Sequence, residues 1–394
     1  MTSNKYKHPL VVGCLLLGIA AIPDVMVVPV LKELTVDRFG VSEGNAHFFM
    51  AVNLLGALLA VGMLALLNRR ISSTVLLSVS ALSSAILMSC MALTTSWGAF
   101  LAFRCVEGGA DLILLAIPLR IIASAGDRER FAGRMGGGFT VLMVAMAIGV
   151  GIGGRLGTPN PENVLWAGSC IMLLLTLIVA IMRTTIENVP TSPRPASSKC
   201  PLLPKEWVGA GFLAIDRGLA ALVSTSLPIL LASGFAIGSI TLGVALAGMF
   251  LALAIFAAPF GILADRFGGK KIRLIASLLC GFSLAGLGCM AWLPPVVVLP
   301  PCLLVYGLGA AGLMPSAFSV AVRPEASNLV YSSLQAAGQT GYSVGVLGGA
   351  LVVTVIALEP ATMLSIMFPI AGLLFILLNG MLLIGIRTLE MRIT

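Results

Sequence analysis

Six ionisable side chains interrupt long apolar stretches of this sequence, and they are the first candidates for chemistry. Ionisable residues at the depth of a lipid bilayer are energetically costly, and they usually face a water-filled cavity or a charged partner. We therefore expect these groups to bind protons or a substrate. The six residues are Asp24, Arg104, Glu107, Asp111, Asp216 and Arg217.

Three of these residues share one face of an expected helix. Successive helical residues turn by about 100°, so Arg104, Glu107 and Asp111 fall within about 60° of one another. Asp24 lies about fifteen residues into the first apolar run, beside Pro23, and therefore near mid-membrane. A lone buried charge could form a structural ion pair, whereas this stripe together with Asp24 favours a polar cavity.

The expected chemistry is proton binding controlled by the position of one arginine. A nearby guanidinium stabilises the ionised form of a carboxylate, and burial in an apolar medium destabilises it. Small movements of Arg104 relative to Asp24 or Glu107 would therefore switch proton binding without a covalent step. Glu107 and Asp111 are the alternative proton carriers to Asp24.

Asp216 and Arg217 are adjacent in the seventh apolar run. Their side chains project about 100° apart, so we expect only one of them to face a cavity. Pairing of Arg217 with a carboxylate from another helix is the alternative. The whole set contains more acids than bases, which favours protons or cationic substrates over anions.

Composition indicates a membrane protein without catalytic machinery. Of the 394 residues, 58% are hydrophobic and 10% are charged, against roughly 25% charged residues in soluble domains. The net charge of +8 fits basic cytoplasmic loops and does not call for nucleic acid. The sequence contains no CxxC pair, metal-spaced His/Cys set, nucleotide-binding loop or nucleophile–base pair. We therefore expect no enzyme activity, cofactor or metal.

Twelve apolar runs are long enough to span a bilayer as helices, which takes roughly 20 residues each. If both termini are cytoplasmic, basic residues including Arg273 gather on the inner side, and only Lys32, Arg38 and Arg155 lie outside. This asymmetry predicts a multi-pass protein of a bacterial-type inner membrane. The expected spans are 9–31, 46–67, 73–93, 97–120, 135–154, 164–182, 207–230, 238–260, 274–292, 297–320, 329–356 and 362–386.

A segment rich in Pro and Ser divides the spans into six plus six. Such composition is typical of a linker. The expected fold is therefore an all-α membrane protein with two six-helix bundles, formed by residues 1–185 and 207–394 and joined by a cytoplasmic linker at 186–206.

The two halves contain an internal repeat. The segment 62–66 overlays 261–265 at an offset of 199 residues, and GVGIGG from Gly149 resembles GVLGG from Gly345. Two six-span halves in parallel arrangement, with the path between them, are a transporter plan.

Uncharged polar residues in the expected spans are candidates for hydrogen bonds to a substrate. Gln335, Gln339 and Tyr342 follow i, i+4, i+7 spacing and form one stripe on the eleventh span, and Asn53 is isolated in the second. Helix–helix contacts are the alternative use of these groups.

The stretch GILADRFGGKK resembles the signature loop of the major facilitator superfamily. This resemblance implies a twelve-helix transporter that alternates access between the two sides of the membrane. It also implies that Asp265 is a latch that contacts basic residues and the N-terminus of a neighbouring helix, expected to be the eleventh. A loop that only sets topology is the alternative. The matching residues are Gly261, Leu263, Ala264, Asp265, Arg266, Gly268, Lys270 and Lys271.

Two further motifs resemble the proton-coupled antiporter branch of that family. Arg104 followed by Gly108 and Gly109 matches a fourth-span signature, near which the family often places a first-span carboxylate. The fifth-span stretch AMAIGVGIGG resembles the antiporter signature, with Val150 in place of the usual Pro. Ordinary small-residue packing is the alternative. The matching glycines are Gly149, Gly153 and Gly154.

The sequence thus predicts a monomeric secondary transporter in the lipid bilayer that exchanges protons for a small-molecule substrate, an amphiphilic or cationic compound. Proton-coupled uptake of a metabolite such as an organic anion or sugar is one alternative. A non-transporting sensor on the same scaffold is another.

Overall fold

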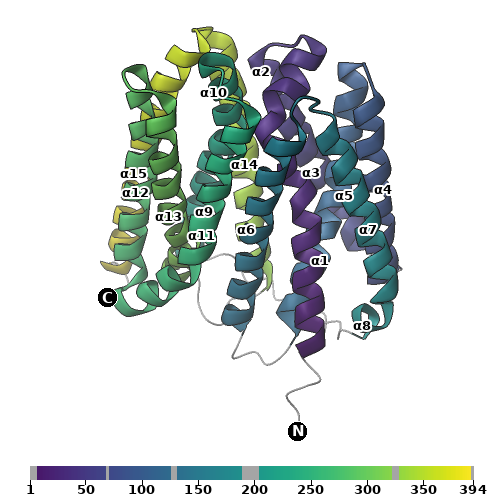
Figure 1. Ribbon diagram of the computed structural model, residues 1–394. Coiled ribbons are helices and arrows are strands. Elements are labelled where there is room, and N and C mark those ends of the chain that lie inside the picture. Colours follow the sequence, from purple (N-terminus) through teal and green to yellow (C-terminus); the bar gives the residue numbers. More distant parts are fainter. Residues whose placement is uncertain (1–6, 68–70, 126–130, 189–203, 322–327, 392–394) are drawn as a thin grey trace. The chain divides into compact units, whose positions relative to one another are not determined.

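The computed structural model describes residues 7–67, 71–125, 131–188, 204–321 and 328–391, and all the regular secondary structure among them is helical (Figure 1). The spatial contacts between residues divide the chain into two compact units. The first unit comprises Met1–Ser192 and Gly238–Ala247, and the second comprises Pro193–Ile237 and Gly248–Thr394. The boundaries predicted from the linker stay a prediction.

The first unit is built from six long helices and several short elements. Ser72 and Ser96 cap two of the long helices, since each side chain accepts a hydrogen bond from a backbone N–H in the first turn. The elements are α1 (Lys7–Met26), η1 (Val28–Val30), η2 (Glu33–Asp37), α2 (Glu43–Ala46), α3 (Phe48–Leu67), α4 (Ser73–Leu93), α5 (Trp97–Ser124), α6 (Phe131–Leu156), α7 (Asn163–Ile181) and α8 (Arg183–Glu187).

The second unit repeats this plan with its own interruptions. Its first long span is a composite, because the π-helical turn η4 joins two α-helices. The elements are α9 (Pro204–Ala221), η4 (Leu222–Ser226), α10 (Leu227–Phe235), α11 (Ser239–Phe267), α12 (Gly269–Gly286), η5 (Leu287–Ala291), α13 (Pro295–Ala321), α14 (Asn328–Ile356) and α15 (Pro360–Met391). The first turns of α11 are grouped with the first unit.

Among the described residues, ten helical segments are long and apolar enough to cross a membrane. Two of the twelve predicted spans fall on other helices, α3 and α5. The side chains of α3 are described only as far as Ala60. Helix α5 carries Arg104, Glu107 and Asp111, so it is too highly charged for an ordinary lipid-embedded helix. The predicted all-α membrane fold is confirmed.

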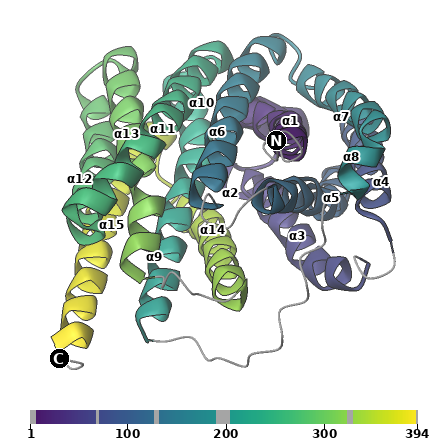
Figure 2. The ribbon, with the colours of Figure 1, turned by 90° about the horizontal axis from the view of Figure 1, so that it is seen from below.

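Equivalent helices pack in equivalent pairs within each unit. Helix α1 packs on α5, α6 and α7, and α9 packs on α13, α14 and α15. Helix α4 packs on α5 and α7, and α12 packs on α13 and α15. Figure 2 shows these helices end-on. The chain therefore uses one six-helix packing scheme twice.

Close glycine contacts give the register of the repeat. In α6, a Cβ on Gly149 would lie 2.6 Å from a carbonyl oxygen of α1, and one on Gly153 would lie 2.1 Å from another. In α14, a Cβ on Gly341 would lie 2.0 Å from a carbonyl oxygen of α9, and one on Gly345 would lie 2.3 Å from another. The predicted match of Gly149 with Gly345 is thus wrong by one helical turn. The glycines and their carbonyl partners are Gly149 with Ile22, Gly153 with Met26, Gly341 with Ala214 and Gly345 with Gly218.

The polar stretch 261–273, predicted to be a loop between spans ending at 260 and starting at 274, is almost entirely helical. Helix α11 continues to Phe267 and α12 begins at Gly269, so Gly268 alone makes the turn. Its φ of 89° and ψ of 134° lie in a region that side-chain-bearing residues rarely adopt. Arg273, predicted to lie in this loop, is instead part of α12, and its side chain is buried.

We predict that Gly268→Ala lowers the stability of the protein by about 1–3 kcal/mol, because the corner requires a positive φ. Thermal unfolding in detergent measures the effect. Gly261→Ala is the matched control: both sites have open space around the added methyl group, but Gly261 lies inside α11. Alanine there should be neutral or slightly stabilising. Equal effects of the two substitutions would contradict this account of the corner.

Candidate functional site

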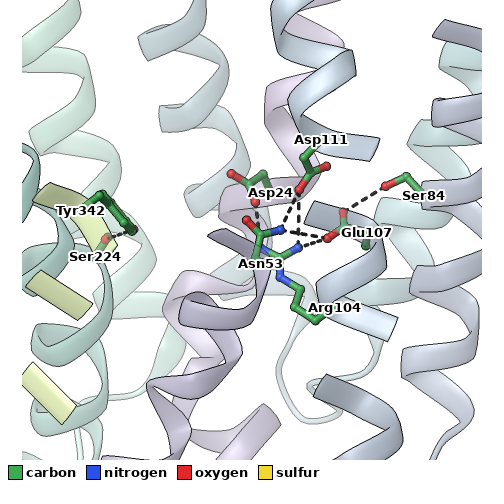
Figure 3. Close-up of polar contacts among 8 residues, drawn as sticks. All are labelled: Asp24, Asn53, Ser84, Arg104, Glu107, Asp111, Ser224 and Tyr342. Atoms are coloured by element: carbon green, nitrogen blue, oxygen red, sulfur yellow. Dashed lines mark hydrogen bonds and ion pairs between the residues drawn. The ribbon is translucent and has the colours of Figure 1, made fainter. Parts of the chain in front are cut away.

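The predicted charge cluster of the first unit is present, and Arg104 is its centre (Figure 3). The side chain of Arg104, on α5, is 1% exposed. Its Nη2 donates to Asp24 Oδ1 of α1 over 2.9 Å, and its Nη1 donates to Glu107 Oε2. Asp111 Oδ2 lies 3.8 Å from Nη1. The structure thus brings together four of the six predicted ionisable residues.

Uncharged groups from two further helices complete this cluster. Asn53 of α3 donates from Nδ2 to Glu107 Oε2 at 3.3 Å and to Asp111 Oδ2 at 3.0 Å. Ser84 of α4 donates to Glu107 Oε1 at 3.0 Å. The ring of Phe49 lies 4.7 Å from the guanidinium carbon of Arg104, a cation–π distance. The sequence pattern singles out Asn53 but not Ser84 and Phe49, which resemble their neighbours in composition.

The three acids of the cluster differ in their exposure to solvent. Glu107 is fully buried and accepts hydrogen bonds from three side chains. The side chain of Asp111 is 13% exposed and that of Asp24 is 36% exposed. Glu107 is therefore the fixed partner of Arg104, and Asp24 is the carboxylate most accessible to a proton or a ligand.

The charges of the cluster do not balance. Three ionised carboxylates around one guanidinium leave two negative charges, and uncompensated charge is costly away from water. In addition, Arg104 Nε is buried without a hydrogen-bond partner among the described residues. An excess of acid at this depth favours the uptake of protons or of a cationic group.

Glycine at two positions allows α3 and α5 to approach closely enough to build the cluster. A Cβ on Gly108 would lie 2.0 Å from Asn53 O, and one on Gly56 would lie 1.7 Å from Cys105 O. Both obstacles are backbone atoms, so a side chain at either position would force the helices apart. Asn53 stands directly at this contact, so its bonds to Glu107 and Asp111 depend on it.

The second unit holds a different ion pair at the equivalent position. Asp216 lies 192 residues after Asp24, the offset that relates the close glycine contacts. It does not pair with its neighbour Arg217. Its two oxygens accept bonds from Nη1 and Nη2 of Arg273 at 2.7 Å and 2.5 Å. The acid thus recurs in both repeats, but the base that pairs with it does not. In the first unit the base comes from α5, the fourth long helix, and in the second unit it comes from α12, the third.

Arg273 is saturated with partners in that second site. Its Nε donates to Asn379 Oδ1 at 2.8 Å, and its Nη1 donates to Leu313 O at 2.9 Å. Phe212 lies 4.3 Å from its guanidinium carbon. One acid and one base form a neutral, enclosed pair, as expected of a structural clamp. Asn379, a lone polar residue in a long apolar run, is the sequence signal that could have revealed this site, but the predicted set does not include it.

The remaining predicted site residues lie apart from these clusters. Arg217 and Gln339 are exposed, and Tyr342 Oη lies 2.6 Å from Ser224 Oγ within the second unit. The side chain of Gln335 falls outside the described residues. Asp265 and Arg266, in the last turn of α11, form no ion pair with the described residues, so the latch stays a prediction. Lys271 likewise forms no ion pair with the described residues, and both Lys270 and Lys271 lie in the first turn of α12.

Comparison with known proteins identifies the family. A family model described as Major Facilitator Superfamily matches residues 13–219, more than half of the chain. The chain belongs to the major facilitator superfamily. It is therefore a multi-pass membrane protein and a secondary transporter of small molecules, not an enzyme. No protein of curated function matches its sequence.

Solved structures agree with the superfamily fold over nearly the whole length. The chain is similar to the nucleoside transporter NupG, with a TM-score of 0.68 and 14% identity over 96% of this chain and 98% of that one. It is also similar to PepTSo2, crystallised as a tetramer, with a TM-score of 0.74 and 12% identity over 99% and 100%. At such identities the likeness shows the fold alone, and the antiporter branch stays a prediction.

We predict that Gly108→Ala destabilises the protein by about 1–3 kcal/mol, because the new methyl group meets the backbone of Asn53. Thermal unfolding and the monodisperse fraction in detergent measure this. Gly98→Ala is the control on the same helix, where nothing lies within 4 Å of the added atom. Similar unfolding temperatures for the two variants would show that the α3–α5 contact is looser than described.

We also predict that Asp216→Asn costs about 3–5 kcal/mol, since it leaves a buried guanidinium without its counter-charge. Asp24→Asn should cost less, because Arg104 keeps Glu107. Thermal unfolding compares the two variants. Combining Asp216→Asn with Arg273→Met should recover part of the loss, because both charges are then removed. If Asp24→Asn is the more damaging change, the division into a structural pair and an accessible site is wrong.

Proposed function

We propose that this transporter is a proton-coupled antiporter that exports a small amphiphilic or cationic compound. The observation that carries the proposal is the division of Arg104 between two carboxylates, one buried and one exposed. Glu107 keeps the arginine charged and in place, and Asp24, at 36% exposure, is the group that can exchange partners.

Coupling follows from competition for one carboxylate. Ionised Asp24 pairs with Arg104 or with a cationic substrate, whereas protonated Asp24 loses its attraction for either. A proton and a substrate cation therefore exclude each other at this position. Linkage makes the effect reciprocal: a proton that weakens substrate binding is itself bound less tightly when the substrate is present.

Asp111 and Asn53 support this exchange. Asn53 bridges Glu107 and Asp111, so a change in charge at one acid is transmitted to the other. Asp111 is less exposed than Asp24 and lies farther from the guanidinium. We assign it as a second proton site that reduces the charge excess of the cluster.

The membrane location is part of the proposal. The excess of Lys and Arg in the segments assigned to the inner side supports a bacterial-type inner membrane with both termini in the cytoplasm. The glycine contacts of α6 with α1 support the antiporter branch, because they hold the helix that carries Asp24 against the fifth long helix.

The decisive test is Asp24→Asn in proteoliposomes. A panel of organic cations, including tetraphenylphosphonium, is first screened for thermal stabilisation of the purified protein at two pH values. The best binder is then followed in transport driven by an imposed pH gradient. We expect the gradient-driven component to fall to the level of empty liposomes, because asparagine cannot exchange a proton.

Asp37→Asn is the control, since Asp37 is 48% exposed and pairs with Lys32 beyond the first span. It should transport like the wild type. The proposal fails if transport by Asp24→Asn responds to the pH gradient as fully as transport by the wild type. It also fails if the pH gradient drives no transport of any cation by the wild type. Arg104→Ala is a poor test, because it would leave Glu107 buried without a counter-charge.

A further inference from the structure

The ring of Phe49 lies against the guanidinium of Arg104 inside the first unit. The ring centre is 4.7 Å from the guanidinium carbon, and the two residues are 0% and 1% exposed. An aromatic ring attracts a cation through its electron-rich face but does not neutralise the charge. Arg104 therefore has two kinds of partner: carboxylates, which compensate its charge, and a ring, which only attracts it.

A stack of aromatic side chains holds the Phe49 ring in place. This ring lies 5.1 Å from that of Phe100, at an interplanar angle of 22°. Phe100 precedes Arg104 by one helical turn on α5, so Phe49 of α3 contacts two neighbouring residues of α5. The rings of Phe39 and Trp97 lie 5.0 Å and 5.8 Å from that of Phe100. Packing of this kind gives the Phe49 ring a fixed position beside the arginine.

Arg38 anchors this stack to the ends of two helices. Its guanidinium carbon lies 5.6 Å from the centre of the Phe100 ring. Its Nη2 donates to Ala92 O and Thr94 O, each over 2.7 Å, at the end of α4. Its Nε lies 3.4 Å from Glu162 Oε1, directly before α7. The stack thus joins a clamp between helix ends to the arginine of the charge cluster.

Phe49 and Asp24 compete for the same guanidinium. Arg104 donates to Asp24 from Nη2 and to Glu107 from Nη1 (Figure 3). When a proton or a cation occupies Asp24, the arginine keeps Glu107 and the ring as partners. A guanidinium attracted to the ring is held back from Asp24. The ring therefore favours the state in which Arg104 has released this carboxylate.

The charges that face Asp24 come from α5 alone among the described helices. Helices α3, α4 and α7, the turn η1 and the first turns of α11 contain no Asp, Glu, Lys, Arg or His. In α6 the charged residues lie near the two ends, and in α8 they pair with each other. Arg155 projects away from α1, because it follows by two residues Gly153, which contacts that helix. The charged residues of α6 and α8 are Arg134, Arg155, Arg183 and Glu187.

We propose that Phe49 is a positioning residue for proton exchange, whose ring holds Arg104 back from Asp24 so that a proton or a substrate cation takes this carboxylate more readily. Phe100 acts behind it by fixing the ring. The inference rests on the proposed exchange at Asp24, and it adds a residue that sets how easily the exchange occurs.

The test weakens the ring's attraction for a cation while nearly preserving its shape. In the purified full-length protein, Phe49 is replaced by phenylalanines that carry one, two or three ring fluorines, which withdraw electrons from the ring face. Infrared difference spectroscopy follows protonation of Asp24 by the carboxylic acid band that is absent from Asp24→Asn. We expect the midpoint of this titration to move stepwise to lower pH, by about 0.3 to 1 unit in total, because Arg104 then holds Asp24 more tightly. Phe49→Leu is a weaker test, since it also removes packing against Phe100.

The same fluorine series at Phe212 is the matched control. Phe212 is also fully buried, and its ring lies 4.3 Å from the guanidinium carbon of Arg273, in the neutral clamp of the second unit. Fluorination there should leave the titration of the Asp24 band unchanged. The inference is refuted if the series at Phe49 leaves the midpoint unchanged or moves it to higher pH, or if both series move it equally.

Gradient-driven transport of the cation panel is measured on the same variants, so that the two proposals can fail separately. With three fluorines at Phe49, the KM for the cation should rise about two- to tenfold, in step with the titration. A shifted titration with an unchanged KM would refute the role of Phe49 in exchange. A wild type without gradient-driven transport would refute the antiport, while the infrared titration still decides whether Phe49 positions Arg104. Absence of an Asp24 band at every pH would refute both.

Discussion

The buried guanidinium of Arg104 is the constraint around which the first unit is organised. A permanent positive charge inside an apolar bundle must be compensated, and the compensation comes from α1 and from the next turns of α5. Because Glu107 is sealed and Asp24 is accessible, one arginine joins a fixed charge to an exchangeable one. Asn53 and Ser84 then hold the carboxylates from α3 and α4. Four helices thus meet at one polar cluster.

The second unit has the same helix packing as the first, but its buried ion pair contains one acid and one base and is neutral. Asp216 occupies the place of Asp24 in the repeat, but Arg273 reaches it from the third helix of the unit and finds Asn379 and Leu313 O as well. A neutral pair with all its donors occupied has no capacity left for a ligand. The repeat has therefore diverged in its electrostatics while retaining its helix pairs.

Glycines at the helix contacts determine how closely the helices that carry the site residues approach one another. Lipid supplies no hydrophobic drive between helices, so close approach depends on small residues at the contact. Gly108 lets α5 touch the backbone of α3 at Asn53, and Gly153 lets α6 touch α1 at Met26, half a turn beyond Asp24. These contacts fix the distance from which each polar side chain reaches Arg104. The antiporter-like glycine motif thus has a direct structural consequence, whatever the branch of the family.

The sequence by itself determined the helical spans, because a bilayer leaves the backbone no alternative to internal hydrogen bonding. It also determined that Arg104, Glu107 and Asp111 share a face, because that follows from helical periodicity. Pairing between helices was decided only by tertiary structure: Arg104 with Asp24, and Arg273 with Asp216. Arg273 was misplaced because basic residues and glycines before it are typical of a loop, whereas one glycine makes the whole turn. Periodicity is a local property, but the partner of a buried charge depends on which glycines allow distant segments to touch.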